Sequence, residues 1–202
     1  MGIDLRLFSI SNQAKFVLEK AQSNIYYAID FDKIQNIESL KLHLKMIQTS
    51  PDGTPEKVIK ELIEDSIQVL NFYPDKRNKN YVFDSYNRCY ATMDYLLEEY
   101  LKDKNKIKTN QIFYKGIDIE CQSEWIRFQY LDYKETAVIS DLLEPISFSE
   151  LIKYYDFEKM TGHVYKLANR ENSIYLEEEF NKLKSFYRHA KELDAFVIIK
   201  MN

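Results

Sequence analysis

The chain closes with an uninterrupted apolar run from Ala195 to Ile199, and this run leaves few folds open to it. It is too short and too rich in β-branched residues for a helix. Because no polar residue alternates with the apolar ones, both faces of the resulting strand must be buried. The run therefore predicts a strand at the centre of a sheet.

A long amphipathic helix is predicted directly before this strand. Its apolar residues recur every three or four positions, as expected for one buried helix face. Acidic residues lie near its positive end and basic residues near its negative end, which the helix dipole favours. The predicted inner face is formed by Leu176, Phe180, Leu183, Tyr187 and Ala190.

The chain also begins with a candidate strand, in which Ile3, Leu5 and Leu7 alternate with charged residues. This two-residue period predicts a strand with one buried face. Ser11 is a suitable N-cap for a helix that follows. Aromatic and β-branched residues at positions 24–31 then predict a further short extended segment.

Helices dominate the middle of the chain. Thr54 is the predicted cap of one of them, with Pro55 at its first position, where a missing N–H has no consequence. Two capping boxes, each a capping residue followed three positions later by Glu, start two short helices at Asp132 and Ser147. The other predicted elements are helices over residues 36–48, 54–70 and 86–100 and strands over residues 111–120 and 125–131.

These elements predict the α+β class, because strands lie at both ends and past the middle while helices cluster between them. We expect a mixed sheet that includes both terminal strands and is packed by amphipathic helices. The chain has 202 residues and shows neither an internal repeat nor a linker. Residues 1–202 are therefore predicted to form a single domain.

The charge balance argues against nucleic acid as a partner. The 28 basic and 32 acidic residues give a net charge of −4, so a phosphate backbone meets no attractive overall field. The first residues carry charge where a signal peptide needs an apolar run, and no stretch is long enough to span a membrane. We expect a cytoplasmic protein that binds neither nucleic acid nor membranes.

Motifs for cofactors and metals are missing from the sequence. The four glycines are too far apart for a phosphate-binding loop. Cys89 and Cys121 are predicted to be free thiols, and the histidines are not paired at helical spacing, so we expect no cofactor and no metal site. Acidic clusters such as Glu61, Glu64 and Asp65 are predicted to lie on outward helix faces as solubilising charges.

Two features leave functional alternatives open. His163 follows Gly162 at a predicted helix end, which is either a helix stop or a loop that carries a functional residue. The chain contains 16 tyrosines, with Tyr154 and Tyr155 adjacent. They indicate either a core rich in tyrosine, which we favour, or a tyrosine-rich surface that binds another protein.

Several segments of the second half resemble one known family. They are Leu131 to Glu135, Leu143 to Leu151, Tyr155 to Met160, Leu183 to Ala190 and the closing Phe196 to Ile199. The chain resembles the YfbM-like family of bacterial domains, domain of unknown function 1877. The resemblance implies a compact bacterial α+β domain and carries no established reaction with it.

Three functional hypotheses follow. The leading one is a binding or regulatory module that acts on another protein, including an inhibitor or immunity-type role. The second is a small-molecule enzyme or sensor with a pocket near Asp156, His163 and Tyr165, with Tyr154 as a further candidate binding residue. The third is a structural role in a homo-oligomer. The second hypothesis predicts a cavity where these side chains converge and a displaced pKa.

Overall fold

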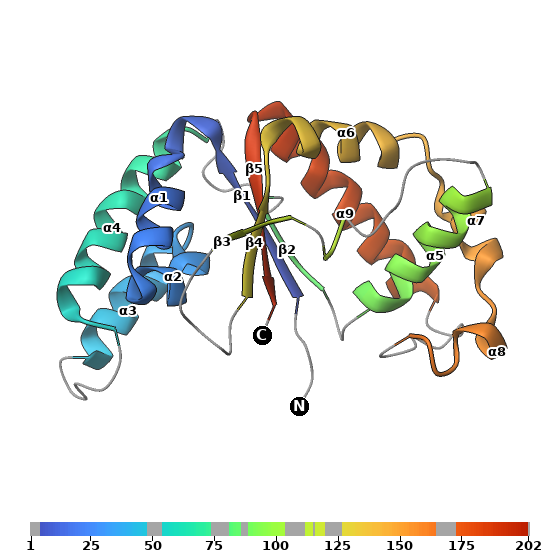
Figure 1. The fold of residues 1–202 in the computed structure, drawn as a ribbon, viewed down its shortest axis with the longest axis horizontal. Coiled ribbons are helices and arrows are strands. Elements are labelled where there is room, and N and C mark those ends of the chain that lie inside the picture. The colour runs from blue at the N-terminus through green and yellow to red at the C-terminus, as the bar shows by residue number, and fades with distance from the viewer. Residues whose placement is uncertain are drawn as a thin grey trace.

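The computed structural model describes residues 5–47, 54–73, 81–85, 89–103, 112–114, 116–119, 127–164 and 173–201. In this part of the chain, one sheet stands between two layers of helices (Figure 1). The strands that begin and end the described chain lie next to each other in the sheet. The α+β class predicted from the sequence, with both terminal strands in the sheet, is confirmed.

Among the described residues, five strands form the sheet in the order β2-β1-β5-β4-β3. Strand β5 occupies the centre, as its uninterrupted apolar run predicted, and pairs with β1 along its whole length. Its other edge pairs with β4, so both rows of its backbone groups are used. The strands are β1 (Leu5–Ser11), β2 (Val82–Asp84), β3 (Ile117–Ile119), β4 (Arg127–Leu131) and β5 (Ala195–Met201).

The helices cover the sheet from both sides (Figure 1). One layer contains α1 (Phe16–Ser23), α2 (Ile25–Ile29), α3 (Ile37–Ile47) and α4 (Glu56–Asn71). The other contains α5 (Tyr90–Asp103), α6 (Tyr133–Leu143), α7 (Phe148–Leu151), α8 (Phe157–Met160) and α9 (Ser173–Glu192). The first layer is drawn in blue to blue-green, and the second runs from green to red.

The sheet separates two apolar cores, and alternate residues of β5 enter each of them. Val197 and Ile199 belong to the core beneath α5, α6 and α9. Phe196 and Ile198 belong to the core beneath α1 to α4. This alternation follows from the two-residue period of a strand, and it explains why the run contains no polar residue.

The closing helix and one capping box are also confirmed. The five residues of the predicted inner face of α9 are all fully buried. At the start of α6, Asp132 accepts hydrogen bonds from the backbone N–H groups of Lys134 and Glu135, each at 2.8 Å. Glu135 in turn accepts the Asp132 N–H at 3.1 Å, which completes the box.

The direction of the strands differs from the expectation of a mixed sheet, because every described pairing is antiparallel. Leu131 at the end of β4 pairs with Val197 near the start of β5. The connection between these strands therefore leaves β4 and enters β5 at the same end of the sheet. A parallel pair needs a crossover connection that returns to the opposite end of the sheet.

Two local predictions were wrong because polar side chains form hydrogen bonds other than those expected. The segment 24–31 contains α2 instead of an extended piece, since the Asn24 side chain accepts the N–H groups of Tyr26 and Tyr27. Thr54 does not cap α4: its hydroxyl donates to the buried carboxylate of Asp30 at 2.7 Å. Pro55 is the N-cap residue in its place.

Two further expectations concern the chain as a whole. A single domain over residues 1–202 stays a prediction, and the sheet that both helical layers share agrees with it. None of the described helices is both long enough and apolar enough to cross a membrane.

The edge pair β3–β4 depends on the absence of a side chain at Gly116. A Cβ atom there would lie 2.6 Å from the carbonyl oxygen of Tyr130 on β4. We expect Gly116→Ala to lower the free energy of unfolding by about 1–3 kcal/mol, measured by urea denaturation, because the strands must separate.

Gly162→Ala serves as the control. Gly162 has a positive φ of 84°, but an added Cβ would meet nothing within 4 Å, so only backbone strain of about 1 kcal/mol is expected. A loss at Gly116 no larger than the loss at Gly162 would contradict the close approach of β3 and β4.

Candidate functional site

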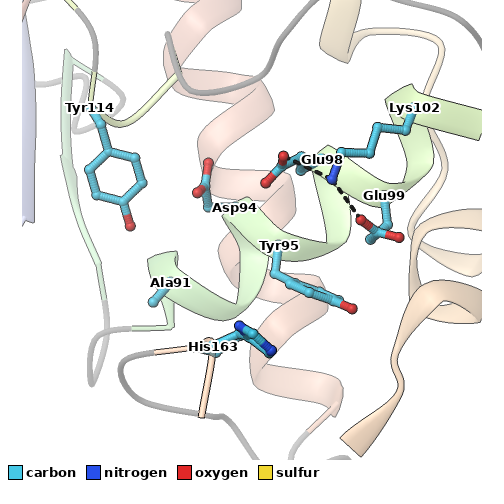
Figure 2. Close-up of a pocket in the computed structure, with 9 residues that line it drawn as sticks. Ala91, Asp94, Tyr95, Glu98, Glu99, Lys102, Tyr114 and His163 are labelled. Atoms are coloured by element: carbon cyan, nitrogen blue, oxygen red, sulfur yellow. Dashed lines mark hydrogen bonds and ion pairs between the residues drawn. The ribbon is translucent and has the colours of Figure 1, made fainter. Parts of the chain in front are cut away.

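A cavity of about 310 Å³ lies along α5, on the side of the sheet that carries α9. Its walls come from α5, from the turn at residues 112–114 and from the loop that follows α8 (Figure 2). We call it the α5 cavity. It is lined by Ala91, Asp94, Tyr95, Glu98, Glu99, Lys102, Tyr114, His163 and Val164.

The amphipathic pattern of α5 determines which residues line the cavity. Met93, Leu96 and Leu97 are buried in the core and anchor the inner face of the helix. Asp94 and Glu98 are four positions apart, so they share a neighbouring face that opens into the cavity. Packing of the apolar stripe thus directs these two carboxylates into the same space.

Asp94 is the most unusual group in the cavity. Its Oδ1 atom is buried and has no hydrogen-bond partner among the described residues. Burial, and secondly the charge of Glu98, raises the pKa of the Asp94 carboxyl to about 7. The group is therefore about half protonated at neutral pH and can exchange a proton there.

Tyr114 faces this carboxyl from the turn at residues 112–114. Burial raises the pKa of its hydroxyl above the ordinary tyrosine value, and the charges of Asp94 and Tyr90 add to this effect. The hydroxyl stays protonated at neutral pH and is available as a hydrogen-bond donor to a bound molecule. Tyr95, from the next position of α5, supplies a second aromatic ring to the lining.

An ion-paired lysine completes the polar lining further along α5. The Lys102 Nζ lies 2.9 Å from Glu98 Oε1 and 3.0 Å from Glu99 Oε1 (Figure 2). Hydrogen bonds to these two carboxylates raise the pKa of Lys102. Because all three side chains are well exposed, the pairs contribute little to stability, and their main effect is on the local charge.

The structure separates the residues that the sequence nominated for a site. His163 is exposed in the loop after α8 and lines the α5 cavity. Asp156 does not line it: the carboxylate caps α8 by accepting the Lys159 N–H at 3.1 Å. Tyr154 is half-buried against Tyr100, with ring centroids 5.9 Å apart, and is not part of the lining. Tyr165 lies outside the described residues.

The sequence analysis missed Asp94, although a signal was present. Asp94 stands four positions after Tyr90 and three before Leu97, two apolar residues whose helical spacing marks a buried face. A carboxylate at such a position is expected to be at least half-buried. Sequence alone does not show whether another element supplies a hydrogen-bond partner for the carboxylate. A carboxylate with such a partner has a structural role, and one without it is a candidate for a binding site.

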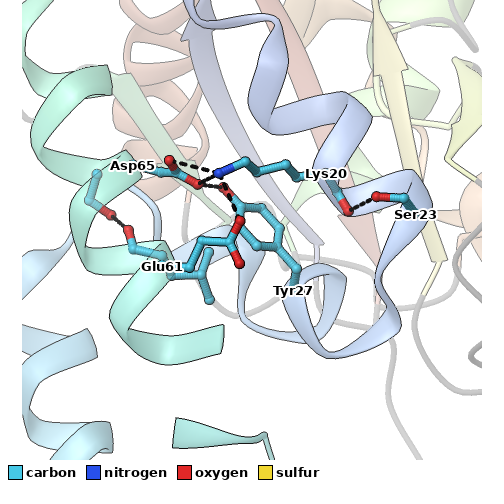
Figure 3. A network of polar contacts seen from close by, with 7 residues as sticks. Lys20, Ser23, Tyr27, Glu61 and Asp65 are labelled. Atoms are coloured by element: carbon cyan, nitrogen blue, oxygen red, sulfur yellow. Dashed lines mark hydrogen bonds and ion pairs between the residues drawn. The ribbon is translucent and has the colours of Figure 1, made fainter. Parts of the chain in front are cut away.

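A second buried carboxylate shows the structural alternative. Asp65 on α4 was predicted to face outward, but it is buried. Asp65 accepts hydrogen bonds from Lys20 Nζ at 2.8 and 3.0 Å and from the Tyr27 hydroxyl at 2.9 Å (Figure 3). This cluster joins α1, α2 and α4, and it gives each carboxylate oxygen at least one hydrogen-bond partner.

Asp30 is a third buried carboxylate, and it is also fully engaged. It forms an ion pair with Lys33, accepts the Thr54 hydroxyl, and lies 3.3 Å from His43 Nδ1. Asp30 and Asp65 therefore follow the rule that buried charges are paired, whereas Asp94 does not. This difference selects the α5 cavity as the candidate site.

Two other features of the described residues bear on this choice. A wider depression of about 790 Å³ lies beside α4 and is lined by equal numbers of basic and acidic side chains: Lys20, Glu56, Lys57, Lys60, Glu61 and Glu64. Within the described ranges, no group of three or more His, Cys, Asp or Glu residues could hold a metal ion.

Comparison with known proteins gives one match. A family model described as "Domain of unknown function (DUF1877)" matches residues 26–200. No curated protein and no solved structure matches the chain significantly.

Asp94→Asn should stabilise the protein in a pH-dependent manner. With its pKa near 7 in the folded state and near 4 in the unfolded state, Asp94 binds more protons when folded, so its presence lowers stability as pH rises through this window. We expect the variant to be about 2–3 kcal/mol more stable near pH 8 and equal to the parent near pH 4. Urea denaturation at both pH values measures this.

Glu98→Gln is the matched control, because its exposed side chain lies one turn away on the same face. It should change the free energy of unfolding by less than about 1 kcal/mol. An Asp94→Asn variant that is less stable than the parent at every pH would show that the carboxylate is well solvated or has a partner.

Asp65→Ala should destabilise the protein by about 2–4 kcal/mol, since it leaves Lys20 and the buried Tyr27 hydroxyl without their shared partner. Glu61→Ala removes an exposed carboxylate from the same lysine and should change stability by less than about 1 kcal/mol. Thermal and urea denaturation of the two variants test the structural role of the cluster. Equal effects would contradict it.

Proposed function

The chain belongs to the family described as Domain of unknown function (DUF1877), and from this premise we propose that it binds a small molecule in the α5 cavity. The family resemblance predicted from the sequence is confirmed at this level. Because the family description names no activity, the proposal depends on the residues of the cavity alone.

The Asp94 carboxyl, whose buried Oδ1 atom has no hydrogen-bond partner among the described residues, carries the proposal. An unsatisfied buried polar atom destabilises a fold, typically by about 1–3 kcal/mol. Asp30 and Asp65 both have hydrogen-bond partners, so they do not share this cost. Because Asp94 also lines the cavity, a bound ligand can contact its carboxyl group and offset part of this cost.

The size and composition of the cavity also support a small ligand. A volume of about 310 Å³ lies at the lower end of ligand sites. Its lining combines apolar and aromatic side chains, Ala91, Val164, Tyr95 and Tyr114, with a few polar groups. Apolar walls bury the body of a ligand, and the polar groups fix its orientation.

An enzyme and a sensor, the two roles of the small-molecule hypothesis, both require that a ligand binds. A carboxyl with a pKa of about 7 can accept or donate a proton near neutral pH, as an acid–base catalyst must. The same property suits a sensor that responds to a ligand. The proposal therefore concerns ligand binding, on which both an enzyme and a sensor depend.

The protein-binding role that the sequence analysis favoured has less support and stays a prediction. Among the described tyrosines, the most exposed are Tyr26, Tyr133 and Tyr175, which belong to three different helices. Leu42 and Met46 on α3 are about 60% exposed, and they form a narrow stripe one turn long. The homo-oligomer, the YfbM-like label, the bacterial origin and the cytoplasmic location also stay predictions.

Filling the cavity should abolish ligand binding. Ala91→Leu places a larger side chain in the cavity wall, so fragments that bind the parent in ligand-observed NMR should lose their signals. Because Ala91 is nearly buried and the change can disturb packing, His163→Trp at the exposed loop provides a second block. Urea denaturation verifies that each variant is folded.

Lys57→Leu, in the depression beside α4, is the control and should retain all fragments. Two results would overturn the proposal: the absence of any fragment hit with the parent protein, or hits that persist unchanged in both blocking variants.

A further inference from the structure

We propose that the ligand of the α5 cavity is an organic ammonium compound, whose positive group contacts Asp94 and whose apolar part lies against Tyr95 and Tyr114. This inference depends on the proposed binding function and specifies the chemistry of the ligand.

The charge of the lining favours a cation. Three of the nine lining residues are acidic: Asp94, Glu98 and Glu99. The basic residue on α5, Lys102, is already paired with Glu98 and Glu99 at 2.9 and 3.0 Å. The Asp94 carboxylate that lines the cavity would therefore repel a bound anion and attract a bound cation.

The aromatic rings favour an organic cation over a metal ion. Ammonium groups are attracted to the faces of tyrosine rings and prefer carboxylates at the same time. A divalent metal needs several oxygen or nitrogen ligands at short distance. The described residues contain no cluster of His, Cys, Asp or Glu that meets this need. Tyr95 and Tyr114, together with Ala91 and Val164, instead suit a carbon skeleton that carries one ammonium group.

Binding of a cation at Asp94 should release a proton. Since the pKa of Asp94 is about 7, a cation that binds only the ionised carboxylate competes with a proton below that pH. The other titratable or charged groups that the structure describes around the cavity are Tyr95, Glu98, Glu99 and Lys102 on α5, Tyr114 from the facing turn, His163 from the loop and Lys159 from α8. Histidine is the residue type that commonly changes charge near neutral pH, so a His163 variant must separate its effect from that of Asp94.

Three probes that share one ring test the inference: benzylammonium, benzyl alcohol and benzoate. Titrations followed by amide chemical shifts in two-dimensional NMR give the dissociation constant of each. We expect benzylammonium to bind at least about tenfold more tightly than benzyl alcohol, and benzoate to bind more weakly than both. From about pH 8 to pH 5, the affinity for benzylammonium should fall about 100-fold, because Asp94 becomes protonated.

Two variants identify the group responsible. Asp94→Asn keeps the shape of the side chain and should reduce benzylammonium binding at least about tenfold, with benzyl alcohol binding unchanged. His163→Gln should keep most of the pH dependence. A pH dependence that vanishes in His163→Gln would assign the effect to the histidine and overturn the role of Asp94.

The outcomes also separate this inference from the proposed function. Tighter binding of benzyl alcohol or benzoate, abolished by Ala91→Leu, would overturn the cationic ligand and leave the binding function intact. If none of the probes and no other fragment binds, the proposed function itself fails.

Discussion

The fold depends on the burial of β5 on both faces. A strand without a polar face is stable only inside a sheet with a cover on each side, and β5 obtains this from β1, β4 and two helical layers. Val197 and Ile199 contact one core, Phe196 and Ile198 the other. Strand β5 follows every described helix in the sequence, so both helical layers must pack around a segment that comes after them.

The buried acids show how this framework separates stability from function. Asp65 joins helices within one layer, and its carboxylate is completely paired. Asp94 is held in a comparable position by the apolar stripe of α5, but no described residue pairs with its Oδ1. Asp65 is buried and Asp94 is half-buried, so the two aspartates differ in burial as well as in partners. A partner can be absent from the folded chain without loss of the fold if a ligand supplies it.

The sequence predicted the features that depend on local pattern. The apolar run of β5, the inner face of α9 and the capping box at Asp132 follow from spacing and residue type. The features it missed depend on contacts between distant segments. Thr54 donates a hydrogen bond to Asp30 instead of capping α4, and Asp65, which was predicted to face outward from α4, binds Lys20. Of the residues that line the candidate site, the sequence nominated His163. The spacing of the helix also indicated that Asp94 is partly buried, but it did not show whether another element supplies a partner.

The central claim is that the Asp94 carboxyl is desolvated at the α5 cavity and that no described residue pairs with its Oδ1 atom. Carbon-detected NMR of side-chain carboxyl groups, with Asp94→Asn for assignment, measures its titration directly in the folded protein. The account predicts a midpoint near 7 for this carboxyl, well above the ordinary aspartate value. A midpoint near the ordinary value of 3.8 would show that Asp94 is solvated or paired, and the candidate site would lose its basis.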